Sequence, residues 1–263
     1  MNYTLHELLN LVLRWTHVFA AILWIGSTYF FTWLDGRLSD PKEGGEVWMV
    51  HSGGFYAVKK EKSPLATQTL HWFKWEAAIT WISGILLFVV VYYIGGVLVD
   101  GESPVSLGVA IGISLGSLVV AWLIYDMLWS SPLGSNEVVG TVISFVLLVA
   151  AAYTFSRIFS SRASYLQIGA IMGTLMAANV WERILPAQRR LVAAAREGTP
   201  LDPALGAEAK KRSKHNTYMV IPVTLIMISN HFPTLTYGSR YNWAVLGVVV
   251  LVGWVAARVI RGR

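Results

Sequence analysis

The sequence predicts an all-α membrane protein: a polytopic helical bundle of about seven transmembrane helices with its N-terminus outside. Three observations predict this class. The 263 residues are 55% hydrophobic and only 14% charged, with a mean hydropathy of +0.53, which soluble domains rarely show. The apolar residues gather in long stretches. The basic residues gather in the connections between those stretches.

Seven apolar stretches are long enough, or nearly long enough, to cross a bilayer, which takes about 20 residues. They are Leu8–Leu34, Ala77–Val99, Val105–Trp129, Val138–Phe159, Ala163–Trp181, His215–Phe232 and Trp243–Ile260. The sixth is the weakest because Pro222 lies inside it. A membrane helix tolerates proline where neighbouring groups satisfy the freed carbonyl, so we expect a bent helix there.

The charge distribution predicts the orientation. All but four of the 21 Lys and Arg residues lie in the connections 35–74 and 183–214 or in the C-terminal tail. Cytoplasmic loops carry this excess, so both connections and the C-terminus should face the cytoplasm. The net charge of +6 therefore requires no nucleic-acid partner. We expect a single integral membrane domain over residues 1–263.

The second long connection contains helical signals of its own. The segment Pro186–Glu197 has helical character, and Asp202 followed by Pro203 resembles an N-cap and a first helical residue. We expect a helix from there to about Lys214 that runs into the sixth stretch. Trp and Tyr residues crowd the ends of the stretches, Tyr125 and Trp129 among them, and an aromatic belt at the membrane interface explains them.

The absence of cysteine limits the redox chemistry. The chain has no Cys, which excludes disulfides, iron–sulfur ligation and covalent c-type haem attachment. A redox cofactor would have to be held by His, by Met or by non-covalent packing. The side chains of Met219 and Met227 are possible axial ligands, although Met in a membrane helix usually fills space.

His17 lies deep within the first apolar stretch, one turn after Arg14. An imidazole at that depth is either hydrogen-bonded to a neighbouring helix or functional, for example as an axial ligand to haem iron. Helical spacing places Arg14, His17, Ala21 and Trp24 near one face. Arg14 could pair with a haem propionate or extend to the outer headgroups.

The predicted topology groups the other histidines by depth. His17 and His231 form an outer pair, and His71 and His215 form an inner pair. These pairs suggest haem b, with one haem favoured over two. His215 and His231 are 16 residues apart, about 24 Å on a straight helix and on nearly opposite faces, so two stacked haems would require a bend at Pro222.

The cytoplasmic side carries candidates for proton transfer and anion binding. Glu76, His51 and His71 are candidate acid–base groups. Lys74, Arg183 and Asn179 are candidate binders of an anionic substrate. The segment His51–Tyr56 contains two glycines whose amides could bind an anion, or it is a plain turn. Small residues recur every four positions, which favours close helix packing or a groove for a flat macrocycle; they are Gly108, Gly112, Gly116, Gly169, Gly173 and Ala177.

Several longer strings resemble one family. They are Arg14–His17 with Trp24–Gly26 and Tyr29–Phe30; Val50–Tyr56; His71–Glu76 followed by Thr80–Gly84; Asn179–Trp181 with Ile184–Gln188; Arg212–Met219; and Met227–Pro233. Together they are similar to the membrane domain of bacterial membrane-bound urate hydroxylases, the urate oxidase N-terminal family. The similarity runs from the first stretch to the seventh.

The resemblance implies an activity and a location. It implies oxidation of urate to 5-hydroxyisourate in the bacterial inner membrane, with oxygen drawn from water and electrons passed to cytochrome c. Relatives often carry a cytochrome c domain, and this chain contains no Cys-x-x-Cys-His, so we expect a separate cytochrome partner or a longer chain. Two other classes stay open, a non-catalytic haem-binding or structural subunit of a membrane electron-transfer complex and a small-molecule transporter.

Overall fold

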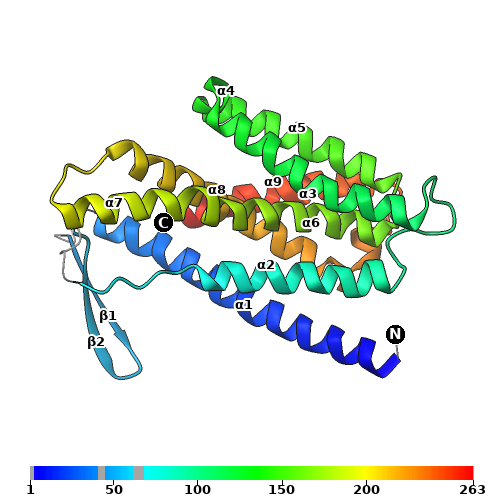
Figure 1. Ribbon diagram of the computed structural model, residues 1–263, viewed down its shortest axis with the longest axis horizontal. Coiled ribbons are helices and arrows are strands. Elements are labelled where there is room, and N and C mark those ends of the chain that lie inside the picture. The colour runs from blue at the N-terminus through cyan, green and yellow to red at the C-terminus, as the bar shows by residue number, and fades with distance from the viewer. Residues whose placement is uncertain (1–2, 41–44, 62–67, 263) are drawn as a thin grey trace.

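The computed structural model describes residues 3–40, 45–61 and 68–262 as a bundle of long helices with one small β-hairpin (Figure 1). The helices are α1 (Tyr3–Leu38), α2 (Trp75–Phe88), α3 (Leu107–Ser130), α4 (Pro132–Ser135), α5 (Glu137–Ser156), α6 (Ser161–Ala178), α7 (Leu185–Glu197), α8 (Pro203–Ile228) and α9 (Asn242–Arg261). Helices α2 and α6 each continue into a π-helical segment, η2 (Val89–Ile94) and η3 (Asn179–Ile184) respectively. Helix α8 is followed by two 3₁₀ segments, η4 (Ser229–His231) and η5 (Pro233–Leu235). The predicted all-α class is confirmed.

Five helices in the described part of the chain are long and apolar enough to cross a membrane. They are α1, α2 with η2, α3, α5 and α9. The expected fifth and sixth spans correspond to α6 and α8, which are helical but do not belong to this group. Both carry buried polar side chains, including Gln167, Asn216 and Thr217, which lower their hydropathy. The count of seven spans therefore stays a prediction, as does the orientation.

The arrangement of the helices places α6 and α8 at the centre. Figure 1 shows α6, η3 and α7 as one continuous rod. Helix α8 packs against this rod and against α9, while α3 and α5 lie on one side of α6, and α2 lies on the other with α1 outside it. The two long connections lie at the same end of the bundle (Figure 1), as the charge pattern predicts for their grouping.

Local signals explain where the connecting helices begin and end. Asp202 accepts a hydrogen bond from the amide of Ala204 and begins α8, and Gly198 ends α7 with a φ of 68°. The helices expected over Pro186–Glu197 and from Asp202 into the sixth stretch are therefore confirmed. Helix α8 continues through Pro222 as one element to Ile228.

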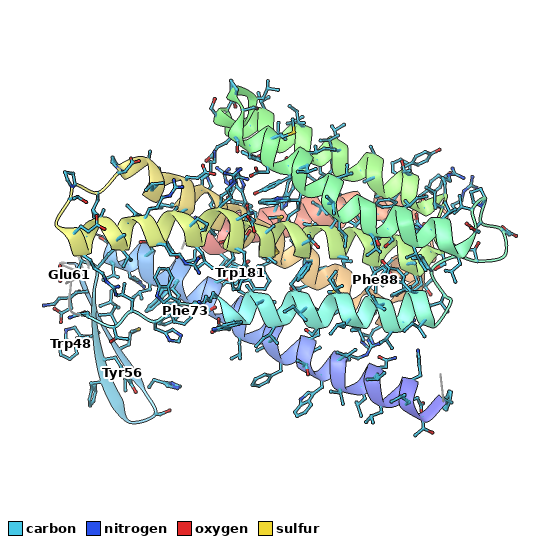
Figure 2. The ribbon with its side chains drawn as sticks, in the orientation of Figure 1. Trp48, Tyr56, Glu61, Phe73, Phe88 and Trp181 are labelled. Carbon is cyan, nitrogen blue, oxygen red and sulfur yellow. The ribbon has the colours of Figure 1, made fainter. Side chains whose placement is uncertain are left out.

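The hairpin formed by β1 (Glu46–His51) and β2 (Gly54–Lys59) lies within the expected connection 35–74, of which residues 41–44 and 62–67 are outside the described residues. Ser52 and Gly53 have positive φ angles of 49° and 79°, as a two-residue hairpin turn requires. The hairpin extends away from the helices (Figures 1 and 2), with Trp48 and Tyr56 far from Trp181 of η3. The two-glycine segment is thus the tip of a hairpin.

An ion cluster joins α3, η3 and α8. The Asp126 carboxylate accepts hydrogen bonds from Arg183 Nε at 2.8 Å and lies 2.9 Å from Arg212 Nη2. Arg212 is completely buried and also bonds Glu208 at 2.7 Å. The hydrogen bond that Arg183 donates to Asp126 raises the pKa of Arg183. Burial raises the pKa of Glu208, but the hydrogen bond and charge of Arg212, together with Lys211, outweigh burial and lower it.

The lowered pKa of Glu208 gives its ion pair a defined pH dependence. A carboxylate whose pKa is lower in the folded state stabilises the fold above its unfolded pKa, and this contribution is lost as the pH falls through the folded value.

The same turn of α8 also caps α3. Lys211 donates to the carbonyl of Trp129 at 2.8 Å, where a cation complements the negative end of the α3 dipole.

Helices touch closely at some glycines and not at others. A Cβ at Gly253 of α9 would lie 2.7 Å from Pro222 Cδ, so α8 and α9 touch through their backbones there. A Cβ at Gly169 would lie 2.9 Å from Ile226, which confirms close packing at that position. The stripe of α3 differs, because a Cβ at Gly108, Gly112 or Gly116 would meet no described atom of another helix within 4 Å.

Substituting Gly253→Ala should destabilise the protein by about 1–3 kcal/mol, because the added methyl group overpacks the crossing at Pro222. The matched control is Gly173→Ala in α6, where a Cβ meets no described atom within 4 Å. Its better helix propensity should raise stability by up to about 1 kcal/mol. Thermal unfolding in detergent measures both. Equal stability of the two variants would contradict the close approach of α8 and α9.

Substituting Asp126→Asn should destabilise the protein by about 3–5 kcal/mol, because it leaves the buried Arg212 without its charge partner on α3. Glu46→Gln is the control. It breaks a pair on the hairpin in which Lys59 is exposed and Glu46 is half-buried, and it should cost less than about 1 kcal/mol. Chemical unfolding of the detergent-solubilised protein compares them, and similar losses would show that the cluster does not hold the bundle.

Candidate functional site

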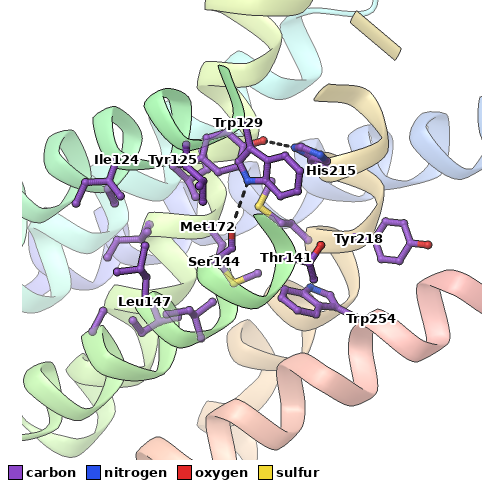
Figure 3. Close-up of a pocket in the computed structure, with 18 of the residues that line it drawn as sticks. Ile124, Tyr125, Trp129, Thr141, Ser144, Leu147, Met172, His215, Tyr218 and Trp254 are labelled. Carbon is purple, nitrogen blue, oxygen red and sulfur yellow. Dashed lines mark hydrogen bonds between the residues drawn. The ribbon is translucent and has the colours of Figure 1, made fainter. Parts of the chain in front are cut away.

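A cavity of about 890 Å³ lies between α3, α5, α6, α8 and α9 (Figure 3). Its walls are mostly apolar, with Leu147, Met172 and Trp254 contributed by three different helices. Small-molecule sites are typically concave and apolar, with a few polar groups that orient the ligand. This cavity has both features, because polar side chains gather at one end of it.

His215 of α8 is the central polar residue of that end. Its Nδ1 lies 2.7 Å from the hydroxyl oxygen of Tyr125, and its ring stands against the Trp129 indole with centroids 4.1 Å apart. The Trp129 indole donates to the hydroxyl of Ser144 at 3.2 Å, which fixes that aromatic wall (Figure 3). His215 Nε2 makes no hydrogen bond within the described ranges.

A buried amide network supports Tyr125 from behind. Asn179 Nδ2 donates to the Tyr125 hydroxyl and to Asn216 Oδ1, both at 2.9 Å. Asn216 Nδ2 donates in turn to the carbonyl of Met176 at 3.0 Å. Asn179 opens the π-helical segment η3, and such insertions are frequent at functional sites. The structure thus joins two predicted site residues, Asn179 and His215, through Tyr125.

Two further features belong to the cavity. Lys214 bonds both carboxylate oxygens of Glu137, at 2.9 and 2.7 Å, and both side chains line the cavity. The indole of Trp254 also lines it, and its buried Nε1–H has no acceptor among the residues that the structure describes. Buried polar groups are normally satisfied, so an unpartnered donor beside a cavity points to a ligand.

His17 lies outside this cavity, between α1 and α2. Its Nδ1 is 2.9 Å from the carbonyl oxygen of Thr80, and a Cβ at Gly84 would lie 2.8 Å from its ring. A carbonyl only accepts, so Nδ1 carries the proton and Nε2 has a free lone pair. A ring N–H that bonds a main-chain carbonyl in this way is common among metal-binding histidines. The predicted hydrogen bond to a neighbouring helix is confirmed, and the ligand role stays a prediction.

The structure does not bring His17 and His231 together. His17 bonds the carbonyl of Thr80 in α2, whereas His6 bonds that of Val90 in η2, about 15 Å further along the same rod. His231 lies at that further end, because its neighbour Asn230 bonds Arg162, which stacks over Tyr92. One iron therefore cannot bind both histidines in this arrangement. Arg14 is exposed and bonds Asn10, not a partner on another helix.

The other predicted residues are dispersed. His51 is at the hairpin tip, His71 is exposed with its ring edge-on to Phe73, and the Lys74 ammonium lies over the Trp75 ring. Arg183 is paired with Asp126 and is not free to bind an anion alone. The remaining candidate is Glu76, whose Oε2 is buried without a hydrogen-bond partner in the described structure. None of these residues lines the cavity.

No cluster of three or more His, Cys, Asp or Glu residues that could hold a metal ion exists within residues 3–40, 45–61 and 68–262. The residues that sequence reasoning missed are Tyr125, Trp129, Glu137 and Trp254. Tyr125 and Trp129 lie near the end of α3, where they resemble an aromatic belt, and only the fold reveals that α3, α5 and α9 turn these four residues toward one cavity. A signal did exist for Tyr125, because it directly precedes Asp126, the single charge in its apolar stretch.

Over residues 3–261 the sequence matches the family described as Urate oxidase N-terminal. It matches no curated protein and no solved structure. The family match covers nearly the whole chain, from the beginning of α1 to the end of α9. The match relates this apolar helical bundle to an oxidoreductase function on urate. The protein belongs to the urate oxidase N-terminal family.

Proposed function

We propose that this protein oxidises urate to 5-hydroxyisourate in the bacterial inner membrane, with water as the oxygen source and cytochrome c as the electron acceptor. The reaction adds the oxygen of one water molecule to C5 of urate and releases two protons and two electrons. Two molecules of oxidised cytochrome c accept those electrons, one each. Family membership supports urate as the substrate, and the chemistry of the cavity supports the site.

One observation supports this cavity as the urate site: it has flat aromatic walls together with two ring nitrogens that lack hydrogen-bond partners in the described structure. Urate is a planar anion with carbonyl oxygens at its edge. The cavity offers the indoles of Trp129 and Trp254 as faces for stacking. His215 Nε2 and Trp254 Nε1 lack partners in the described structure and supply polar contacts at the edge. Lys214 lies at the same end, where it is paired with Glu137.

Glu137 is the carboxylate in this site that can accept a proton from water or urate. It lines the cavity and is held by two hydrogen bonds from Lys214. It therefore takes the general-base role that the sequence suggested for Glu76, His51 and His71, none of which lines the cavity. The Lys214 and Glu137 side chains are 34% and 59% exposed, so both reach the solvent at this end of the cavity, where water for the reaction can enter.

His17 is the residue whose geometry fits a haem ligand. Its Nδ1–H is engaged by the carbonyl of Thr80, so the free Nε2 lone pair is available for iron. A b-type haem, when bound there, would accept electrons one at a time and pass them to cytochrome c. Arg14, one turn away on the exposed face of α1, could pair with a propionate.

One assay separates this proposal from the alternatives. Purified protein is mixed with urate and oxidised cytochrome c, and cytochrome reduction is followed together with 5-hydroxyisourate formation. Turnover supports the enzyme. Urate uptake into vesicles by haem-free protein, without turnover, supports a transporter. A haem spectrum without any response to urate supports an electron-transfer subunit.

Substituting Trp254→Phe should weaken urate binding about tenfold, since it removes one N–H donor, a loss of about 1.4 kcal/mol, while keeping an aromatic wall. The matched control is Trp243→Phe on the same helix. Trp243 packs against Tyr153 and does not line the cavity, so its replacement should leave affinity unchanged. Equilibrium titration with urate measures both. Equal affinities for the two variants would place the urate site elsewhere.

Substituting His17→Ala should remove most of the haem absorbance of the purified protein, because the axial lone pair is lost. The control is His6→Ala, which removes an imidazole from the same helix, where it bonds the carbonyl of Val90. Reduced-minus-oxidised spectra, normalised to protein, compare the variants with the wild type. Full haem content in His17→Ala, or none in the wild type, would overturn this part of the proposal.

A further inference from the structure

In the buried hydrogen-bond network behind the cavity, each donor and acceptor can be assigned. The assignment starts at a main-chain carbonyl. The carbonyl of Met176 can only accept, so the group of Asn216 that faces it at 3.0 Å must be the NH₂ group. This fixes the Asn216 amide, whose oxygen consequently points to Asn179. That oxygen in turn requires a donor, so the NH₂ group of Asn179 faces it at 2.9 Å.

The direction continues through Tyr125. The second hydrogen of the Asn179 NH₂ group is donated to the Tyr125 hydroxyl oxygen at 2.9 Å. The phenolic hydrogen must then go to the other neighbour, His215 Nδ1, at 2.7 Å. In the reverse direction, His215 would donate to Tyr125, and the phenolic hydrogen would have no acceptor in the described part of the chain. A buried donor without an acceptor is costly, so the first arrangement is favoured.

We infer that Asn216, Asn179 and Tyr125 are positioning residues that hold neutral His215 with its proton on Nε2. The imidazole therefore presents a hydrogen-bond donor toward an anionic oxygen of the ligand in the cavity, and it offers no lone pair at Nε2 for iron. His17 has the opposite tautomer, because its Nδ1 donates to Thr80. The network thus assigns His215 to substrate and removes it from the set of haem ligands.

The tautomer follows from hydrogen bonding alone, and the identification of the ligand as urate rests on the proposed function. Urate suits the donor because its ring carbonyls and its negative charge make it an acceptor along most of its edge. A neutral apolar molecule of the same size would leave both Nε2–H of His215 and Nε1–H of Trp254 unpaired. The cavity therefore selects planar anions over apolar rings.

The direct test is ¹⁵N nuclear magnetic resonance of protein labelled at histidine and solubilised in detergent, near neutral pH and without ligand. The His215 signals are assigned by their loss in His215→Gln. The expected spectrum shows His215 with a protonated Nε2 and an unprotonated Nδ1. A protonated Nδ1 in the wild type would overturn the inference, and this result needs no variant of the network to fold.

A binding series tests the role of the tautomer. Tyr125→Phe removes the donor to Nδ1 and should weaken urate binding about tenfold, with mixed tautomers in the spectrum. Tyr153→Phe, which removes a hydroxyl outside the cavity, should change neither. His215→Gln keeps an N–H donor and an acceptor for Tyr125, so it should bind urate more tightly than His215→Leu. Equal affinity of those two His215 variants would overturn the role of the donor.

The outcomes distinguish the two proposals. If His215 carries its proton on Nε2 but the protein neither binds nor oxidises urate, the proposed function fails and the assignment of the tautomer stands. If urate is oxidised but His215 carries its proton on Nδ1, the proposed function stands and this inference fails.

Discussion

The hydrogen bond from Asn216 to the carbonyl of Met176 is the constraint on which the site depends. A main-chain carbonyl cannot exchange its role, so it gives the buried network a fixed direction. The donor and acceptor of each later hydrogen bond follow from the one before, as far as the ring of His215. Met176 lies at the C-terminal end of α6, immediately before the π-helical segment that begins at Asn179. Met176 and Asn179 therefore both bond Asn216 of α8, the first as an acceptor and the second as a donor.

His17 and His215 have opposite tautomers because different groups bond their Nδ1 atoms. A backbone carbonyl accepts a hydrogen bond from His17 Nδ1–H and leaves a lone pair on Nε2, whereas a phenol donates a hydrogen bond to His215 Nδ1 and leaves the ring proton on Nε2. An unprotonated imidazole nitrogen binds iron, and a protonated one binds an anion. This difference divides the proposed reaction between two places, with substrate between α3, α5, α6, α8 and α9 and electron transfer beside α1 and α2.

The sequence predicts the helices well and the site poorly, for physical reasons. Long apolar stretches and the signals at Asp202 and Gly198 are local, so α7, α8 and the apolar helices could be predicted from composition and spacing. At His51–Tyr56 the sequence alone predicts only a turn or an anion site, although the strands on either side are rich in β-branched and aromatic residues. The cavity depends on which faces of five helices meet, which no local pattern records. Trp254 could not be distinguished from the many other Trp residues of the apolar helices, while Asn179 could be identified because helical spacing places it on one face with Arg183.

The ion pair that stabilises the fold and the hydrogen bond that orients His215 are coupled, because neighbouring residues of α3 make them both to α8. Tyr125 and its neighbour Asp126 on α3 contact His215 and Arg212, which are three residues apart on α8. Two contacts on one turn of each helix fix both the rotation and the height of α8 relative to α3. A change in the ion pair would therefore move the phenol relative to the imidazole. The buried charge of Arg212, costly to the fold on its own, is thus the anchor that keeps the hydrogen bond to His215 in register.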